Sequence, residues 1–320
     1  MTGSLLTSHL LMIRFLLRRL FHGLLVLWVV VTLTFALMRV LPGGPFDRDR
    51  RLPPEVMANI EAKYHLDESL LAQYARYIAG IAQGDLGPSY KYTDRTVRDI
   101  IIDTFPTSTA LGLLALLLAL ALSFPLGITA ATYHDRWIDR GCVFLATLGI
   151  SLPTFVLGAV LIWIFSLKLG WFQAARWGAP GSAVLPAITL GAMPCAQLTY
   201  LLRSSLLETL GEDFIRTARA KGLSESLVLF KHAVRNSLIP VLTLLGPLFA
   251  ILVAGSFVVE YVFAIPGMGR FFITAVTDRD YPLIMGVTLV YTAILVGANL
   301  VVDMLYSVVD PRMGTREMMP

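Results

Sequence analysis

The stretch TFPTSTALGLLALLLALALSFPLGITAATYH, residues 104–134, contains no Asp, Glu, Lys or Arg. An α-helix needs about 20 apolar residues to cross about 30 Å of bilayer hydrocarbon, and this stretch exceeds that length. Further runs without a charged residue occupy residues 20–38, 141–167, 177–202, 236–259 and 281–302. We therefore predict an all-α, polytopic integral membrane protein with six transmembrane helices.

The composition favours the same fold class. Of 320 residues, 56% are hydrophobic and 15% are charged, whereas about a quarter of the residues in an average soluble domain are charged. Cys142 and Cys195 allow at most one bridge, which excludes a disulfide framework. The net charge is +4, but the basic residues are not concentrated on one helix with interleaved aromatic residues, as in a nucleic-acid-binding surface. We expect a lipid bilayer as a partner, and no nucleic acid.

The placement of basic residues predicts the orientation. Thirteen Lys and Arg residues lie in the short connections on one side of the predicted spans, and four lie on the other side. The positive-inside rule therefore places both termini in the cytoplasm. The run 20–38 is longer than a signal-peptide core, so we expect an uncleaved first span, with Met1 or Met12 as the start of translation.

The chain divides into four predicted parts. Residues 1–41 form a cytoplasmic N-terminus and the first span, 42–106 an extracytoplasmic cap, 107–310 a core with five spans, and 311–320 a cytoplasmic tail. Apolar residues recur at helical spacing over 56–64 and 70–81, which predicts two amphipathic helices in the cap. A loop is expected at 84–89. Pro106 is the expected helix start of the second span.

The cytoplasmic segment 209–236 is far longer than a reversal of direction requires. Acidic residues at Glu212 and Asp213 favour a helix start, and Gly222 is the expected left-handed end of that helix. A second short helix is predicted to begin at Ser224. Its apolar face would carry Leu223, Leu227, Phe230 and Val234. The segment is either an amphipathic hairpin on anionic headgroups or a docking element for a groove in a soluble partner.

Resemblance favours docking. Residues 213–222, continued through 232–240, resemble the cytoplasmic coupling loop of ABC importer permeases, in the version found in peptide permeases. Residues 260–269, 279–282 and 310–312 resemble the C-terminal half of these proteins, and 41–43, 52–66 and 84–87 resemble their B-type subunit. One departure is Arg216-Thr217-Ala218, where the general family pattern has Glu-Ala-Ala before the glycine.

The resemblance implies a type I ABC importer permease fold and transport of oligopeptides across the cell inner membrane. It also implies a C-type permease in a heterodimer, two cytoplasmic ABC ATPase domains and an extracytoplasmic peptide-binding protein as partners. A dipeptide or related small-solute permease is the alternative within the family, and an ion-coupled secondary carrier is the alternative from another class. The ATPase-coupling residues implied are Asp213, Phe214, Ile215, Arg216, Thr217, Ala218, Arg219, Ala220, Lys221 and Gly222.

The sequence lacks the motifs of several kinds of catalytic and nucleotide-binding site. There is no phosphate-binding loop of the form Gly-x-x-x-x-Gly-Lys-Ser/Thr, so we expect ATP and Mg²⁺ to bind to partner ATPases and this chain to be no enzyme. No zinc-protease or Cys/His cluster motif occurs, and we expect no bound cofactor or metal. The charged residues nearest the spans lie within about two turns of a span end, which argues against an ion-coupled carrier. They are Arg203, Glu208, Glu260 and Asp303.

The stretch Pro266-Gly267-Met268-Gly269 interrupts helix after the fifth apolar run. Two interpretations stay open for it. The flanking aromatic residues Tyr261, Phe263, Phe271 and Phe272 favour an interfacial anchor. The glycines allow close backbone approach, which favours an outer gate that moves during transport.

Overall fold

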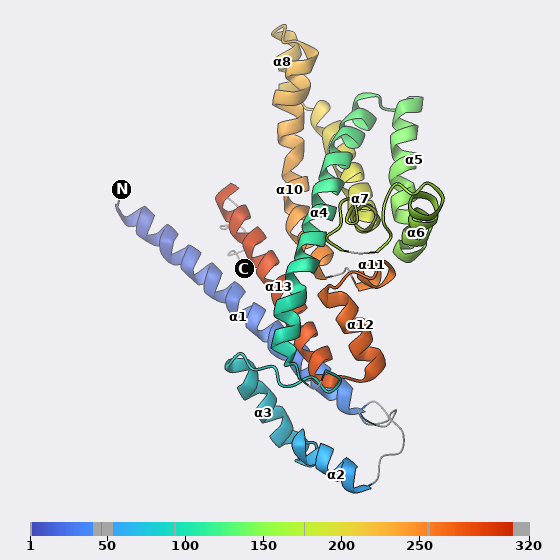
Figure 1. Cartoon of the computed structure of the whole chain (residues 1–320). Helices are drawn as coiled ribbons and strands as arrows, with labels where there is room; N and C mark the ends of the chain where they lie inside the picture. Colours follow the sequence, from blue (N-terminus) through green and yellow to red (C-terminus); the bar gives the residue numbers. More distant parts are fainter. Residues whose placement is uncertain are drawn as a thin grey trace. The chain divides into compact units, whose positions relative to one another are not determined.

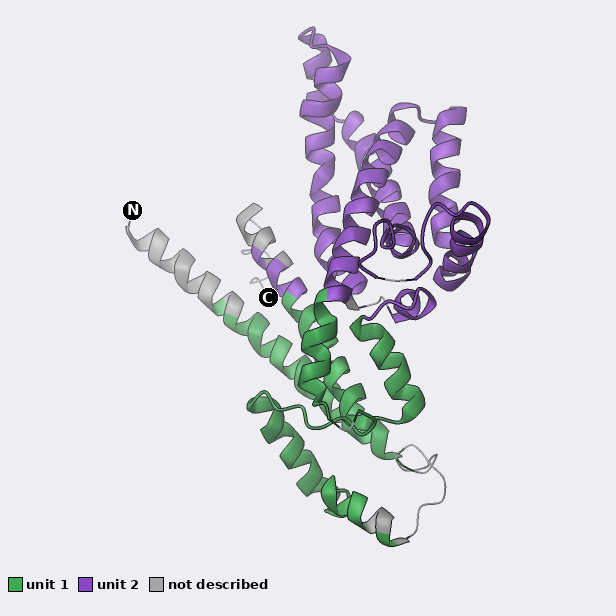
Figure 2. Cartoon of the chain, viewed as in Figure 1, with its two compact units in different colours: residues 1–106, 267–297 green, residues 107–266, 298–320 purple. Residues whose placement is uncertain are grey.

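A computed structural model describes residues 2–40, 46, 54–92, 94–175, 177–254 and 257–309. Helices dominate these residues, which contain no β-strand beyond an isolated bridge between Pro88 and Thr96 (Figure 1). The chain forms two compact units (Figure 2). Unit 1 comprises Met1–Pro106 and Gly267–Gly297, and unit 2 comprises Thr107–Pro266 and Ala298–Pro320. The all-α prediction is confirmed.

Unit 1 contains α1 (Thr2–Val40), α2 (Pro54–Lys63), α3 (Leu70–Ala82), α12 (Met268–Asp278) and the first parts of α4 (Val97–Thr132) and α13 (Tyr281–Val309). Helices α2 and α3 lie where the sequence predicts two amphipathic helices. Ser69 caps α3, because its Oγ accepts a hydrogen bond from the backbone N–H of Ala72 at 3.4 Å.

The predicted loop at 84–89 is present and is held by a buried carboxylate. Asp280 accepts hydrogen bonds from the Ser89 hydroxyl and from the backbone N–H groups of Tyr90 and Lys91, at 3.2 and 3.3 Å for the two backbone donors. Gly87 has a φ of +82°, a conformation that glycine adopts without strain. The aspartate therefore joins this loop to the start of α13.

Helix α4 starts at Val97, nine residues before the predicted start at Pro106. The start signal is a capping box at Thr96 and Asp99. The Thr96 N–H and hydroxyl both donate to Asp99 Oδ2, at 3.1 and 2.6 Å, and Asp99 N–H donates to Thr96 Oγ1 at 3.2 Å. These reciprocal bonds satisfy the first backbone donors, so the helix does not need the proline to begin.

Unit 2 contains the rest of α4 and α13 together with the helices from α5 to α11. These are α5 (Trp137–Ser151), α6 (Thr154–Leu161), η1 (Ile162–Lys168), α7 (Val184–Leu210), α8 (Asp213–Ala220), α9 (Glu225–Leu227), η2 (Val228–Val234), α10 (Arg235–Ala254) and α11 (Phe257–Val262). Helix α7 is the centre of the unit, because it packs against α5, α6, α10 and α11. Its buried residues, such as Leu185 and Leu198, join two apolar clusters.

Among the described residues, five helices are long and apolar enough to cross a membrane, and a bent pair brings the number to six. The five are Leu17–Val40, Val97–Thr132, Val184–Leu210, Glu225–Val262 and Tyr281–Val301. The third apolar run instead folds as Trp137–Ser151 and Thr154–Lys168, bent by 106°. Pro153 explains the break, since proline cannot donate to the preceding turn and disfavours helical backbone at Leu152. Leu152 is indeed extended, with a ψ of 125°.

Candidate functional site

The segment 209–236 presents one short amphipathic helix, α8, beyond the end of α7 (Figure 1). Ile215 and Ala218, three residues apart, are buried, whereas Phe214, Arg216 and Thr217 are exposed. The other exposed members of the predicted coupling set are Asp213, Arg219, Ala220, Lys221 and Gly222. The helix therefore has an anchored inner face and an outer face, formed by residues 213, 214, 216, 217, 219 and 220, with no covering element in the described chain.

An apolar cluster anchors the inner face of α8. Ile215 is fully buried with Leu206 at the end of α7, Val228 in η2 and Ala131 at the end of α4. Burying such a side chain contributes roughly 2 kcal/mol relative to leaving it exposed. The orientation of α8 is therefore fixed by its contacts with three other helices.

The corner after α8 is a left-handed cap, as predicted. Gly222 has a φ of +76°. Its N–H donates to the carbonyl of Arg219 at 2.9 Å, and Leu223 N–H donates to the carbonyl of Ala218 at 3.4 Å. This pair of bonds is the Schellman arrangement, which satisfies carbonyls at the helix end.

A salt bridge crosses the same corner. Arg219 donates from Nε to Glu225 Oε1 at 2.9 Å and from Nη2 to Oε2 at 3.2 Å. Both side chains are exposed, so the pair orients the corner more than it stabilises the fold. Arg216 and Asp213 form a looser, exposed pair at 3.4 Å.

The second predicted short helix is not separate. From Glu225 the chain runs through α9, η2 and α10 as one continuous helical segment to Ala254. The predicted apolar face is wrong in part, because Leu227 and Phe230 are exposed and Val228, Ala233 and Val234 are buried. The π-helical turn at Val228–Val234 contributes, since a π-helix bonds residue i to i+5 and so places Val228 and Ala233, five residues apart, on the buried face. Phe230 is exposed at 60%, as Phe214 is at 42%.

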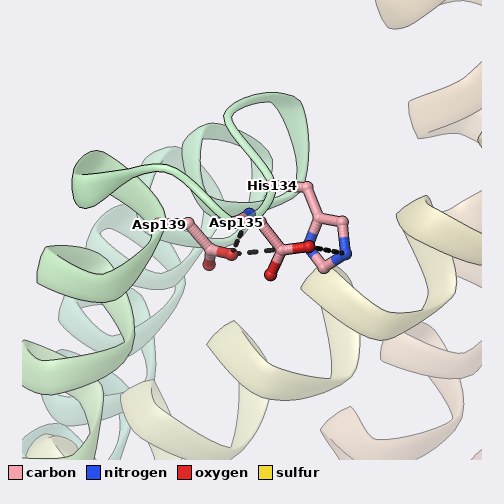
Figure 3. A group of neighbouring side chains, drawn as sticks. All are labelled: His134, Asp135 and Asp139. Atoms are coloured by element: carbon pink, nitrogen blue, oxygen red, sulfur yellow. Dashed lines mark hydrogen bonds and ion pairs between the residues drawn. The ribbon is translucent and has the colours of Figure 1, made fainter.

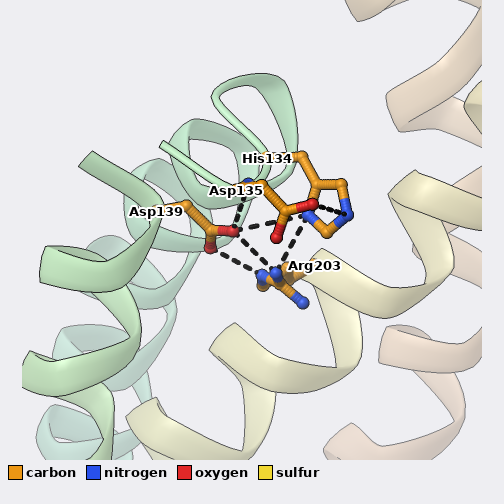
Figure 4. A network of polar contacts seen from close by, with 4 residues as sticks. All are labelled: His134, Asp135, Asp139 and Arg203. Carbon is orange, nitrogen blue, oxygen red and sulfur yellow. Dashed lines mark hydrogen bonds and ion pairs between the residues drawn. The ribbon is translucent and has the colours of Figure 1, made fainter. Parts of the chain in front are cut away.

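A charged cluster lies where α5 meets α7, formed by His134, Asp135 and Asp139 (Figure 3). Their ligand atoms approach within 4.8 Å of one another, a spacing that suits a cation. Arg203 of α7 already fills that place (Figure 4). It bonds both oxygens of the buried Asp139, at 2.8 and 2.7 Å, and its Nη2 lies 3.1 Å from His134 Nδ1. The cluster is therefore an ion pair that joins two helices, and a metal would have to displace the guanidinium.

The predicted gate stretch follows a second left-handed cap. Ala264 has a φ of +52°, and Ile265 N–H donates to the carbonyl of Glu260 at 2.8 Å. Pro266 is exposed, whereas Gly267, Met268 and Gly269 are buried. Of the flanking aromatic residues, Phe263 is buried in an apolar cluster and so cannot serve as an interfacial anchor, while Tyr261 is exposed.

Two buried polar contacts of unit 2 were not predicted from the sequence. Glu260, expected near a helix end, is completely buried and accepts a hydrogen bond from Ser108 Oγ at 2.7 Å. Arg203 pairs with Asp139, which lies 64 residues earlier in the chain. Single-sequence periodicity carries no signal for either partner, because both pairs depend on which helices pack together.

Comparison with known proteins matches nearly the whole chain. Residues 123–315 match the family described as binding-protein-dependent transport system inner membrane component, and residues 12–112 match the N-terminal family of the same systems. The oligopeptide transport system permease protein OppB of Haemophilus influenzae is 42% identical over 304 residues, covering 94% of this chain and 99% of that protein. The dipeptide transport system permease protein DppB of Bacillus subtilis is 44% identical over 301 residues, covering 94% and 98%.

Solved structures support the fold. The crystal structure of an amino acid ABC transporter with histidines aligns with a TM-score of 0.50 at 17% identity, covering 67% of this chain and 94% of that one. An inward-facing form of the MetNI methionine ABC transporter aligns with a TM-score of 0.50 at 18% identity, covering 64% and 95%. At this identity the likeness concerns the fold alone. The family matches and the curated relatives show that the chain belongs to the binding-protein-dependent transport system inner membrane components, the permease subunits of ABC importers.

Proposed function

We propose that this chain is the B-type permease subunit of an ATP-driven importer of oligopeptides, and that α8 couples it to the ATPases. The family implies a multi-pass inner membrane protein that works with a second permease, ATPases and a binding protein. The observation that carries the coupling role is the outer face of α8. It is exposed, held by Ile215 beneath it, and ended by a fixed corner at Gly222.

The proposed mechanism uses α8 as a rigid lever. ATP and Mg²⁺ bind to the partner ATPases, which close on each other and move α8 through contacts with Phe214 and its neighbours. Because Ile215 and Ala218 are packed against α4, α7 and η2, the movement passes directly to three helices of unit 2. Closure would open the peptide pathway outward, and hydrolysis would reset it.

The remaining partners follow from the same proposal. They are a C-type permease, two cytoplasmic ABC ATPase domains, and an extracytoplasmic peptide-binding protein that delivers the substrate. Both termini and α8 would lie in the cytoplasm, and the cap at 42–106 would face the binding protein. Relatives named for oligopeptides and for dipeptides match with nearly the same identity, 42% and 44%. Dipeptide import is therefore the second candidate.

We also propose that Pro266, Gly267, Met268 and Gly269 form part of an outer gate. Met268 is buried, so a probe belongs on the exposed Ala264, where Cys adopts the same backbone as Ala. In the assembled complex, Ala264→Cys should crosslink to cysteines on the partner permease in the resting state and much less in an ATP-trapped state. Equal crosslinking in both states would contradict a moving gate.

The overall function is tested by reconstitution. The chain is co-expressed with a C-type permease, both ATPases and the binding protein, and the complex is purified. It is then placed in proteoliposomes, and ATP is supplied either inside or outside the vesicles. We expect ATP-dependent uptake of labelled peptides that needs every subunit. An assembled complex that moves no peptide of two to five residues, or that moves peptides without ATP, would refute the proposal.

A further inference from the structure

A cavity of about 280 Å³ opens on the side of α7 in unit 2. Its wall combines residues of α6, α7, α10 and α11, helices that pack against α7. None of its described lining residues carries a charge, and several are large apolar side chains left exposed. They include Phe155, Met193, Ile251 and Val258. The flexible side chain of Met193 adapts to occupants of different shape.

One polar side chain stands out in this wall. Gln197 is the central residue of α7 (Val184–Leu210), so it lies at the middle of a span. Within the described residues its amide makes no hydrogen bond, and the side chain is half-buried at the cavity. A polar amide in the bilayer core is costly unless something bonds it, which marks such a residue for a function.

A second hydrogen-bonding group accompanies Gln197 on the same helix. Pro194 has no N–H, so the carbonyl of Leu190 lacks its usual helical donor. Leu190, Pro194 and Gln197 all line the cavity. The amide of Gln197 offers both a donor and an acceptor, and the Leu190 carbonyl offers a further acceptor. Such a set complements the N–H and C=O groups of an extended peptide main chain.

We propose that Gln197 bonds the main chain of the peptide in transit and so makes the pathway select for peptide backbone rather than side chain. The inference rests on the proposed peptide-import function. Main-chain bonds are common to every sequence, and a wall without charged residues favours neither sign of charge on the side chains. A cavity of this size accommodates a short stretch of the chain, so the contact would be made residue by residue as the peptide moves.

The test compares Gln197→Leu with the unaltered chain in the reconstituted complex, using a tripeptide and its N-methylated forms, which lack one main-chain N–H. We expect Gln197→Leu to lower uptake of the unmodified tripeptide about 3- to 10-fold, the effect of one lost hydrogen bond. The N-methylation penalty is the ratio of tripeptide uptake to uptake of an N-methylated form. At one position this penalty should be at least threefold smaller in the variant than in the unaltered complex. The binding protein is common to both complexes, so its own preference cancels in this ratio.

Met193→Leu is the matched control, because it changes the same wall without a polar group. Its N-methylation penalties should equal those of the unaltered complex. If the penalties are also equal for Gln197→Leu at every position, the proposal is overturned. A Gln197→Leu chain that is inserted and stable but no longer assembles with the partner permease overturns it too, because Gln197 would then bond that permease. A complex with the unaltered chain that imports no peptide would instead refute the proposed function.

Discussion

Replacing Gly222 by Val tests whether the corner after α8 controls coupling. At a φ of +76° an L-residue raises the backbone free energy by about 1–2 kcal/mol. For a β-branched residue this cost lies at the upper end of that range or above it. A Cβ at this position meets no atom within 4 Å, so the cost comes from the backbone and not from crowding. The two capping hydrogen bonds that hold the corner are worth about 0.5–1.5 kcal/mol each.

Strain and capping therefore nearly balance in Gly222→Val, and the corner no longer holds one conformation. A shift of about 1.4 kcal/mol is tenfold in a population, so we expect peptide uptake to fall about tenfold. Insertion and assembly should be unchanged, because the spans and the Ile215 anchor are untouched. The assay is uptake and ATP hydrolysis per complex in proteoliposomes, and we expect hydrolysis to continue while uptake falls.

Gly222→Asn is the matched control, since Asn tolerates the left-handed region far better than Val. It should retain most of the uptake. Normal uptake by the assembled Gly222→Val complex would refute the reasoning. Equal loss in both variants would also refute it, because the defect would then come from the added side chain and not from backbone strain.

Three further predictions concern packing and charge. Phe214→Ala should lower peptide uptake about tenfold without lowering the melting temperature. The exposed control Leu71→Ala on α3 should change neither the uptake nor the melting temperature. A lower melting temperature in Phe214→Ala would mean that Phe214 has a structural role. Arg203→Leu leaves Asp139 buried without its partner and should lower the free energy of unfolding, measured by thermal denaturation, by about 3 kcal/mol. The double variant Asp139→Leu with Arg203→Leu should recover most of this lost stability. No recovery in the double variant would contradict the ion-pair argument. Burial raises the pKa of Tyr90 to about 12, so the folded state keeps a proton that the unfolded state loses above its ordinary pKa of about 10. The stabilising contribution of Tyr90 should therefore be constant up to about pH 10 and be lost from there toward pH 12. The melting temperature of the unaltered chain should fall more steeply over this range than that of Tyr90→Phe, and an equal fall in both would contradict this.

The predictable parts of this molecule are those that depend on local sequence. The apolar runs other than the third, the two helices of the cap and the left-handed end at Gly222 follow from periodicity and from glycine, and the structure has helices and the cap there. The helix α4 shows how a local signal can be missed, because the capping box of Thr96 and Asp99 starts the helix at Val97, nine residues before the more conspicuous Pro106.

The parts that could not be predicted depend on packing between distant segments. Pro153 indicates a break in the third apolar run, but the bend of 106° is set by what α5 and α6 contact. The π-helical turn before Arg235 changes which side chains of the second coupling helix are buried, and a regular 3.6-residue period cannot represent it. Likewise, Asp280 stabilises the loop at 84–92 across almost 190 residues of sequence.

The most direct test of coupling through α8 is crosslinking from its outer face in intact membranes. A photoreactive crosslinker on Phe214→Cys is activated, and the products are identified by mass spectrometry, with Leu71→Cys as the control site. If α8 couples this permease to its energy source, Phe214→Cys forms an adduct with an ATP-binding subunit, and Leu71→Cys forms none. Adducts of Phe214→Cys with lipid alone, in membranes that contain the assembled transporter, would contradict coupling through α8.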